Sequence, residues 1–567
     1  MSGGVSNSDS KYKFFYPTST SSGSLPNGRG GVSTGEYLSW LNENTLNYTN
    51  LFKGIHNVDA TLGFSMQKTT NEFYRMEARN FNIQSLGYDA LDIGTLAVNP
   101  GSGKSQSQLA SLFGIVRYTL KDRYLFTAQM RADGSSKFPK NRWGYFPYVG
   151  VGWKIHEEPF FAGVKNISTL KLSINYAHTG NEGIPSYSSL SRYSPIPSNR
   201  DAEQGLTTAL VPMNYGVGDL RWETNIQSNL QLNLGLFNDR ILLTADAYHK
   251  KSKDLLLADE ISVVSGYSAV YRNVGDVEVK GLEFNLNTQN IKGKKFSWYT
   301  NFNIAFTKGK VLKLNGKIDE FISSGGRNAN FLVKVGERLG NMYGYVVDGI
   351  YNTTEEFYNS PENQVLSANV GFRKFKDISG EDGKPDGVVD DFDRTILGNG
   401  NPKFFGGFNN EFRFSNIDFS FLFTYSYGND VINMNKSLYT LAGLWQSGLE
   451  EYYLHHFTNQ NPQVNANAWS GAYDNEWDQT TSYLVEDGSY LRLKNIMLGY
   501  TLPVQKFNNS FVKSLRLYLS AQNLLTFTKY TGFDPEVNLN NSILVPGVDY
   551  GSYPRSRFYS LGINANF

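Results

Sequence analysis

The amino-acid sequence predicts an all-β protein, a transmembrane antiparallel up-and-down β-barrel. Three observations predict this fold. Apolar residues recur at every second position in many segments, as they do in strands with one apolar face. The connections between these segments alternate between short and long. Aromatic residues are abundant, with 36 Tyr, 38 Phe and 8 Trp among 567 residues, and membrane barrels carry aromatic girdles where the wall meets the membrane surface.

Composition excludes several classes of function. No run of about 18 apolar residues occurs, so no membrane-spanning helix is expected. The net charge of +1 gives no strong attraction toward nucleic acid, and we expect no nucleic-acid partner. The lack of cysteine rules out disulfides, thiolate metal sites and cysteine nucleophiles. The opening stretch, MSGGVSNSDSKYKFFYP, contains no apolar core of an export signal.

The segment NIDFSFLFTYSYG shows the strand pattern clearly, because its aromatic residues share one face with Ile417. The last stretch, RFYSLGINANF, alternates in the same way and ends on the aromatic Phe567, as expected for a strand that ends at a membrane surface. Such segments predict about 15 strands, each long enough to cross the hydrocarbon when tilted. The predicted strands lie near 37–50, 57–72, 109–120, 124–134, 145–155, 169–178, 223–236, 240–256, 274–288, 295–308, 403–414, 416–428, 487–501, 514–526 and 557–567. The strand at 487–501 alternates poorly, which predicts a bulge.

The predicted connections differ in length in a regular way. The short ones are 51–56, 121–123, 156–168, 237–239, 289–294, 415 and 502–513. The mostly long ones are 73–108, 135–144, 179–222, 257–273, 309–402, 429–486 and 527–556. Short periplasmic turns and long extracellular loops are typical of bacterial outer-membrane barrels. The sequence therefore predicts a cell outer-membrane location with Phe567 on the periplasmic side.

Alternation alone also fits a soluble β-sandwich. One alternative is therefore a secreted all-β protein that binds or hydrolyses glycans, which predicts solubility without detergent and, for a hydrolase, a pair of catalytic carboxylates. Another is a surface-exposed barrel or adhesin scaffold that transports nothing. The repeated aromatic faces and the asymmetry of the connections favour the membrane barrel, and no catalytic residue is assigned.

Stretches along the chain carry a family resemblance. They include RADGSSKFPKNRWGYFPYVGVGWKIHEEPF at 131–160, LKLSINYAHTGNEGI at 170–184, NVGDVEVKGLEFNLN at 273–287, GNPKFFGGFNNEFRFSNIDFSFLFTYSYGNDV at 400–431 and DGSYLRLKNIMLGYTLP at 487–503. In order and density they resemble the SusC/RagA family of TonB-dependent outer-membrane transporters. The resemblance runs from about residue 15 to the end of the chain.

The resemblance implies a 22-stranded barrel plugged by an N-terminal domain. It implies three partners: a SusD-like lipoprotein that covers the extracellular mouth, the TonB complex, which engages the plug, and outer-membrane lipid around the wall. It also implies import of oligosaccharides or peptides rather than an enzymatic activity, with no required cofactor.

The sequence departs from this pattern in its N-terminal part. No signal peptide, plug domain or TonB-binding segment is recognisable in it. We therefore interpret residues 1–36 as part of an extracellular loop and residues 37–567 as the C-terminal portion of the barrel, with the plug domain and the first seven strands absent.

An acidic stretch, DISGEDGKPDGVVDDFDR, predicts a possible calcium site in the loop 377–393. Calcium prefers several oxygen ligands on a flexible, glycine-bent loop. The candidate ligands are Asp377, Asp382, Asp386, Asp390 and Asp393. Asp391 lies in the same stretch and adds to its acidic character. The insertion KPDG and the lack of a Glu at the twelfth position depart from an EF-hand loop. The alternative is a solvated acidic turn.

Aromatic residues in the long connections are the candidates for substrate contact, because sugar rings stack on aromatic faces. They are Trp143, Trp445, Trp469, Tyr473 and Trp477. The alternative is that they anchor the loops on one another or on the SusD-like lipoprotein. Trp153, Trp222 and Trp298 lie at or in predicted strands, which predicts a place in the aromatic belt at the membrane surface.

Overall fold

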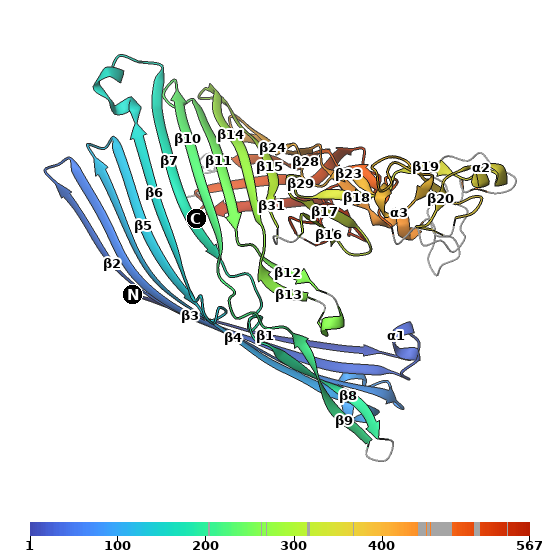
Figure 1. Cartoon of the computed structure of the whole chain (residues 1–567). Helices are drawn as coiled ribbons and strands as arrows, with labels where there is room; N and C mark the ends of the chain where they lie inside the picture. The colour runs from blue at the N-terminus through green and yellow to red at the C-terminus, as the bar shows by residue number, and fades with distance from the viewer. Residues whose placement is uncertain are drawn as a thin grey trace. The chain divides into compact units, whose positions relative to one another are not determined.

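The computed structural model describes residues 1–201, 205–261, 263–267, 269–314, 318–366, 368–439, 479–503, 511–540 and 542–567, together with residues 450, 454 and 457. Strands make up most of the regular structure (Figure 1). Within these residues, no helix combines the length and the apolar character needed to cross a membrane.

Sixteen strands form one antiparallel meander, in which each strand pairs with the next strand of the sheet along the chain. The strand numbers skip where a connection contains additional strands that belong to smaller sheets. In order they are β1 (Ser2–Tyr16), β2 (Arg29–Phe52), β3 (His56–Phe81), β4 (Gly94–Leu120), β5 (Tyr124–Ser135), β6 (Trp143–Lys154), β7 (Ile167–Asn181), β10 (Glu223–Leu236), β11 (Ile241–Lys253), β14 (Asp276–Lys292), β15 (Phe296–Lys313), β24 (Phe404–Phe414), β25 (Ile417–Tyr427), β28 (Tyr490–Leu502), β29 (Ser514–Thr528) and β31 (Phe558–Asn566). The predicted all-β, up-and-down order is confirmed, and each of the 15 predicted strands overlaps one of these.

The assignment of residues 1–36 to a loop was wrong for most of this segment. Residues Ser2–Tyr16 form β1, which pairs with β2 from Ser2↔Glu43 to Tyr16↔Arg29. Only residues 17–28, which include the short helix α1 (Ser21–Ser24), connect the two strands. The Gly- and Ser-rich composition of β1 hides the strand, because small residues on both faces leave no apolar alternation to detect.

The connections alternate in length as predicted, except that 136–142 is shorter than the following connection 155–166. Short ones occupy 53–55, 121–123, 155–166, 237–240, 293–295, 415–416 and 503–513. The others occupy 17–28, 82–93, 136–142, 182–222, 254–275, 314–403, 428–489 and 529–557. Because the meander is antiparallel, every second connection belongs to the same end of the sheet.

The longer connections hold strands and helices of their own. The added strands are β8 (Arg192–Asp201), β9 (Gly205–Asn214), β12 (Leu256–Glu260), β13 (Ala269–Asn273), β16 (Glu320–Ser324), β17 (Asn330–Lys334), β18 (Asn341–Gly344), β19 (Val347–Ile350), β20 (Glu362–Asn363), β21 (Arg373–Phe375), β22 (Val388–Val389), β23 (Thr395–Asn399), β26 (Asp430–Asn433), β27 (Val485–Asp487) and β30 (Val548–Asp549). The α-helices α2 (Thr354–Asn359) and α3 (Met434–Tyr439) are one or two turns long. The 3-10 helices cover Gly87–Asp89, Leu91–Ile93, Ile155–Glu157, Pro159–Phe161, Val263–Ser265 and Asp391–Asp393.

Two compact units divide the chain. Unit 1 comprises Met1–Trp153, Ile174–Ser228 and Lys251–Gly275, and unit 2 comprises Lys154–Ser173, Asn229–Lys250 and Asp276–Phe567. Each is described by itself below.

The strands of unit 1 have one apolar, exposed face. Along β6, Tyr145, Val149 and Val151 alternate with residues of the other face and are exposed. Along β3, Leu62, Phe64 and Met66 form the equivalent exposed row. The opposite face of β6 carries Phe146, which is buried against loop residues. The large apolar rows of unit 1 are therefore not sandwiched against a second sheet.

The wall of unit 2 carries rows of aromatic residues across neighbouring strands. Phe302 pairs with Phe408, and Phe408 pairs with Phe423, so one row crosses β15, β24 and β25. Such cross-strand pairs pin the register of a sheet. On β31, Leu561 and Ile563 of the apolar face are 77% and 65% exposed, which again contradicts burial between two stacked sheets.

The predicted bulge in the strand at 487–501 is confirmed at Lys494. The register of β28 shifts there against both neighbours, β25 and β29. Leu493 pairs with Phe423 before the shift and Ile496 pairs with Phe421 after it. The extra residue moves the apolar positions from odd to even numbers, which explains why the alternation looks poor in the sequence.

Candidate functional site

The candidate site is the loop layer of unit 2, which is formed by the three connections 314–403, 428–489 and 529–557. These connections share a buried apolar cluster. Its members come from all three of them and include Phe331, Met342, Ile432, Leu484 and Val548. A cluster of this size makes the loops a small folded layer instead of independent flexible segments.

Backbone hydrogen bonds join the same connections. Tyr345 N donates to Thr480 O at 3.0 Å, and Ser482 N donates to Tyr345 O at 2.9 Å. Ile432 N donates to Gly547 O at 2.8 Å, where β26 and β30 run parallel. Beside them, a Cβ on Gly344 would collide with the carbonyl oxygen of Thr480, so this approach requires glycine.

Tyr345 links the apolar cluster to the acidic stretch. Its ring stacks on Phe375 with the centroids 5.1 Å apart. Its hydroxyl donates to Asp391 Oδ1 at 3.2 Å and accepts from Arg394 Nε at 3.0 Å. Burial raises the pKa of Tyr345 to about 12, so the hydroxyl remains a donor at neutral pH.

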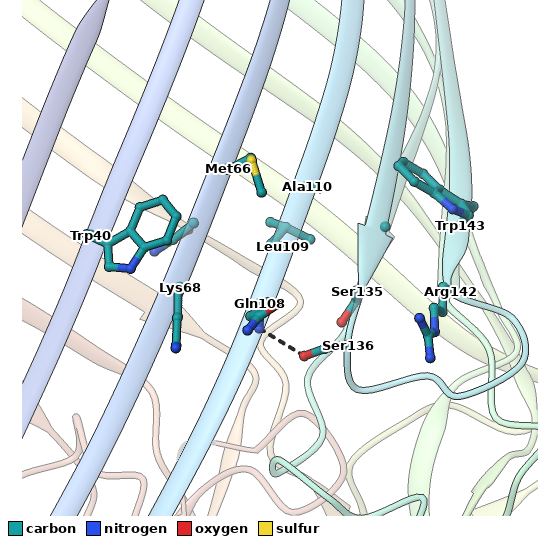
Figure 2. Close-up of a pocket in the computed structure, with 12 residues that line it drawn as sticks. Trp40, Met66, Lys68, Gln108, Leu109, Ala110, Ser135, Ser136, Arg142 and Trp143 are labelled. Atoms are coloured by element: carbon teal, nitrogen blue, oxygen red, sulfur yellow. Dashed lines mark hydrogen bonds between the residues drawn. The ribbon is translucent and has the colours of Figure 1, made fainter.

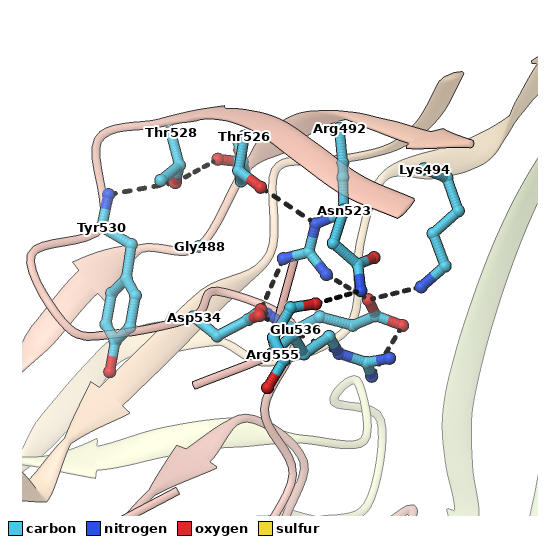
Figure 3. A network of polar contacts seen from close by, with 12 residues as sticks. Gly488, Arg492, Lys494, Asn523, Thr526, Thr528, Tyr530, Asp534, Glu536 and Arg555 are labelled. Atoms are coloured by element: carbon cyan, nitrogen blue, oxygen red, sulfur yellow. Dashed lines mark hydrogen bonds and ion pairs between the residues drawn. The ribbon is translucent and has the colours of Figure 1, made fainter. Parts of the chain in front are cut away.

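An ionic network fastens the connection 529–557 to the wall strand β28 (Figure 3). Arg492 is 1% exposed, and its Nη2 and Nη1 atoms lie 2.6 Å from Asp534 Oδ1 and 2.9 Å from Glu536 Oε2. Its Nε atom donates to Thr526 Oγ1 at 3.1 Å. Arg555 adds a contact of 3.2 Å to Glu536 Oε1. Since the planar guanidinium bonds three acceptors, it fixes both the loop and its direction.

A second polar group lies beside this network. Tyr530 donates to Asp549 Oδ2 at 2.6 Å, and burial raises the pKa of Tyr530. Glu486 accepts from Thr531 N at 2.8 Å and from Lys436 Nζ at 2.9 Å. Burial opposes ionisation of Glu486, but these donors outweigh it and lower its pKa. An ion pair and a backbone hydrogen bond at Glu486 therefore join α3, β27 and the connection 529–557.

The carboxylates of the acidic stretch accept hydrogen bonds from backbone N–H groups, and calcium binding there stays a prediction. In the described part of the chain, no group of three or more acidic or histidine side chains is placed to hold a metal ion. Asp393 is fully buried and accepts the backbone N–H groups of Ile378, Ser379 and Asp390 at 2.6, 3.0 and 2.8 Å. The other candidates also accept backbone N–H groups: Asp377 from Gly387, Asp382 from Lys384, Asp386 from Val388 and Asp390 from Phe392.

Of the predicted substrate-contact residues, Trp445, Trp469, Tyr473 and Trp477 lie outside the described residues. Trp143 opens β6 and is 52% exposed. It shares a face with the apolar row of that strand, on the side of the sheet away from Phe146.

The belt prediction for Trp222 was wrong. Trp222 is buried against Phe138 and Phe146 in unit 1, and its Nε1 donates to Arg142 O at 2.8 Å. It anchors a connection instead of facing a membrane surface. Sequence reasoning also missed Arg492 and Tyr345. For Arg492 the sequence did carry a signal, because an arginine inside a predicted strand needs acidic partners when it is buried.

These features define a class: an outer-membrane wall protein with an exposed apolar face and a packed layer of long loops at one end. The chain belongs to the TonB dependent receptor-like, beta-barrel family, which matches residues 3–524. The predicted resemblance and the outer-membrane location are confirmed, and its relatives are receptors and transporters, not enzymes.

Individual relatives agree with this assignment. The chain is 34% identical, over its whole length, to TonB-dependent receptor P3 of Formosa agariphila, and covers 56% of it. It is 30% identical to TonB-dependent receptor SusC of Bacteroides thetaiotaomicron over 82% of this chain and 44% of that protein. The RagAB peptide transporter structure matches with a TM-score of 0.83 at 23% identity, over 99% of this chain and 59% of that chain. The chain spans about half the length of the curated relatives it matches.

Proposed function

We propose that this chain is the C-terminal portion of the barrel of a SusC/RagA-like TonB-dependent transporter that imports oligosaccharides or peptides across the outer membrane. In this proposal, further strands complete a 22-stranded barrel around a plug domain. A SusD-like lipoprotein covers the loop layer, and the TonB complex acts through the plug. Residues 37–567, extended by β1, form the wall.

The observation that carries the proposal is the sixteen-stranded meander with an exposed apolar face. Apolar rows of this kind are costly in water and favourable in lipid. The family match over residues 3–524 supports the same reading. The packed loops of unit 2 suit a docking platform, because a preordered surface loses little entropy when a lipoprotein binds.

The two alternatives are less well supported. A soluble glycan-binding or glycan-hydrolysing protein would bury its apolar rows between sheets, and the rows of both units are exposed. A scaffold without transport has no observation in its favour. The aromatic residues Trp143, Trp445, Trp469, Tyr473 and Trp477 remain a prediction for substrate contact.

Growth and co-purification test the proposal. A host strain that lacks the gene should lose growth on a subset of oligosaccharides or peptides as sole nutrient, and the restored gene should recover it only when TonB is functional. The affinity-tagged protein, extracted in detergent, should co-purify with a SusD-like lipoprotein. Unchanged growth on every oligosaccharide and peptide mixture, or release of the protein without detergent, would contradict the proposal.

A further inference from the structure

Four strands of unit 1 extend past the rest of its sheet. β2, β3 and β4 are 24, 26 and 27 residues long, and β5 pairs with β4 only as far as Leu109. Beyond that point the Gln108 N–H donates to Ser136 Oγ at 2.9 Å, as the dashed line in Figure 2 shows. β1 pairs with the outer part of β2. The outer parts of β1 to β4 therefore form a four-stranded extension that continues past β5.

One face of this extension contains a groove of about 400 Å³. Two neighbouring rows of cross-strand partners line it. The first row is Ser8, Tyr37, Asn71 and Ser105. The second row, two residues further along β3, is Ser10, Gly35, Phe73 and Gly103. A Cβ on Gly103 would collide with the Phe73 ring, so the ring lies against bare backbone and the floor of the groove stays low.

The groove lies on the face opposite the apolar row of the wall. β3 pairs with both neighbours without a register shift from His56 to Arg75, so its side chains alternate regularly over this range. The exposed apolar residues Leu62, Phe64 and Met66 therefore share one face, and Asn71 and Phe73 share the other.

The groove also lies beyond the membrane. Asn71 is fifteen residues past His56, which starts β3 at a short turn. With a rise of about 3.3 Å per residue and a tilt of about 40°, fifteen residues climb about 38 Å, whereas the apolar band of such a barrel is about 25 Å tall. In the proposed transporter, this position is on the inner side of the wall near the extracellular mouth.

The groove presents aromatic rings among hydroxyl and amide groups. Phe73 is 52% exposed and Tyr37 is 37% exposed, although both lie on the polar face. The backbone of β2 and β3 is paired on both sides here, so a peptide cannot add to the floor as a further strand. A ligand meets side-chain rings, hydroxyls and amides instead, and these groups suit the apolar faces and the hydroxyls of a sugar.

Arg192 supplies a positive charge to the groove. It opens β8, is half-buried, and its Nε donates to Asn214 Oδ1 on β9 at 2.9 Å. The other charged residues of the described lining are Glu36, Glu72 and Lys104, which form the row between the two rows above. Strand alternation sends their side chains to the opposite face, where Glu72 pairs with Lys104. Arg192 is therefore the charge that a ligand in the groove would meet.

The surroundings of the groove on the same face are also cationic. Arg75 is the next residue of this face of β3 after Phe73, and its side chain is 52% exposed. It belongs to the cluster in which Arg29, Arg75 and Arg79 share the single carboxylate of Glu77. This excess of positive charge favours an anionic ligand over a neutral one.

We propose that this groove is a binding subsite for an acidic sugar unit, one that carries a carboxylate or a sulfate. The sugar ring packs on Phe73 and Tyr37, and Asn71 and the serines bond its hydroxyls. The acidic group lies at Arg192, since a planar guanidinium matches the oxygens of a carboxylate or a sulfate. The inference rests on the proposed function and narrows its substrate to acidic oligosaccharides.

An oligosaccharide array probed with the purified protein in mild detergent tests the inference. The array carries uronate and sulfated oligosaccharides of different linkage, each beside its methyl-esterified or desulfated counterpart, together with acidic peptides. We expect the acidic member of at least one pair to bind at least tenfold more tightly than its neutral counterpart. The uronate and sulfate pairs distinguish the two kinds of acidic group.

Two variants connect this preference to the groove. Arg192→Gln should reduce the preference to within twofold, because the neutral amide retains a donor but loses the charge. Phe73→Ala should weaken binding of both members of the pair at least fivefold and keep their ratio, because the ring contacts the sugar and not its acidic group. Both variants should melt at the same temperature as the unaltered protein, since neither residue belongs to the buried cluster of unit 1.

Arg142→Gln is the matched control. It removes one positive charge from an exposed residue of the connection 136–142, outside the groove lining, and should leave the preference unchanged. An equal loss in the two arginine variants, stronger binding of neutral sugars or of acidic peptides, or no binding on the array would overturn the inference. The proposed function is tested separately, because growth of the deletion strain and co-purification of the lipoprotein do not depend on the acidity of the substrate.

Discussion

At the scale of single residues, Glu77 joins three arginines near the loop end of β3. Arg29, Arg75 and Arg79 lie 2.8, 2.8 and 2.9 Å from its carboxylate, and the side chain is 4% exposed. Hydrogen bonds from Arg29, and then from Arg79 and Arg75, hold the pKa of Glu77 at about 2 against the opposing effect of burial. The carboxylate therefore organises a cluster that would otherwise repel itself.

This arrangement predicts a pH-dependent stability of the β2–β3 loop end. The pKa of Glu77 is lower in the folded state than in the unfolded state, so its ionised carboxylate stabilises the folded state fully above about pH 4.5. This stabilisation is lost as the pH falls toward about 2, where the folded protein takes up the proton. We expect Glu77→Gln to reduce the local free energy of opening by about 2 kcal/mol at pH 7. The difference should shrink when the pH falls to 3. Amide hydrogen exchange of residues 29–35 measures it.

The control for this prediction is Glu72→Gln on the same strand. Glu72 pairs with Lys104, accepts a long hydrogen bond of 3.4 Å from the Tyr74 hydroxyl and is more exposed than Glu77, so its loss should change exchange little. If Glu77→Gln leaves exchange unchanged at pH 7, the arginine cluster does not depend on its carboxylate.

Arg492 predicts the behaviour of the connection 529–557. Replacement by Met leaves Asp534, which is 6% exposed, without its main cationic partner. Breaking a buried pair on one side costs roughly 3 kcal/mol. We expect Arg492→Met to raise the rate of limited proteolysis within 529–557 at least tenfold while the wall stays folded, as followed by mass spectrometry of the fragments.

Lys494 supplies the matched control, because it lies two residues away and reaches Glu536 only at 3.9 Å. Lys494→Met should leave the cleavage rate within about twofold of the unaltered protein. Equal sensitivity of the two variants would mean that general loss of charge, and not the buried guanidinium, loosens the loop.

At the scale of elements, the acidic loop 377–393 is held by carboxylate caps. Asp393 satisfies three backbone N–H groups in a capping box around Asp390. We expect Asp393→Ala to lower the protection of the Ile378 and Ser379 amides by about a hundredfold, since hydrogen bonds to a buried carboxylate are worth about 1.5–3 kcal/mol each. Hydrogen exchange read at single-residue resolution measures this loss.

Calcium should not replace these caps. Protection of the loop should be the same with millimolar calcium and with a chelator, because the carboxylates already point at backbone donors. The control Asp382→Asn alters a side chain with one short-range contact, to Lys384 N, and should have little effect. Protection that rises with calcium, and falls in Asp382→Asn, would restore the calcium interpretation.

The wall elements could be predicted from the sequence because their lipid-facing rows repeat with a period of two. The limits of that signal explain the errors. β3 continues to Phe81 and β4 starts at Gly94, beyond the predicted strands. Their outer parts escaped prediction because polar and apolar residues are mixed on both faces there. The same lack of contrast hid β1. The caps of the acidic loop could not be predicted, since they depend on which N–H groups the fold brings to Asp393.

At the scale of the whole molecule, the predicted sidedness is the feature on which transport and lipoprotein docking both depend. The wall explains why sidedness follows from the sequence. An antiparallel meander sends every second connection to the same end, and these alternate connections are longer than their neighbours apart from 136–142. The ion pairs that hold the connection 529–557 to the wall could not be predicted in the same way. Arg492 meets Asp534 and Glu536 through tertiary packing, and their spacing in the sequence does not indicate it.

Cysteine labelling tests this sidedness directly, because the chain contains no cysteine and each variant therefore carries a single reactive thiol. Glu355→Cys puts a thiol on the exposed helix α2 in a long connection, and Lys294→Cys puts one in the exposed short turn 293–295. A membrane-impermeant maleimide should label Glu355→Cys in intact cells to near completion. It should label Lys294→Cys only after the outer membrane is permeabilised, because the periplasmic end of the wall is otherwise out of reach. The unaltered protein should stay unlabelled in both conditions. Labelling of Lys294→Cys in intact cells with protection of Glu355→Cys would reverse the orientation, and would remove the basis for an outward loop layer and for lipoprotein docking on it.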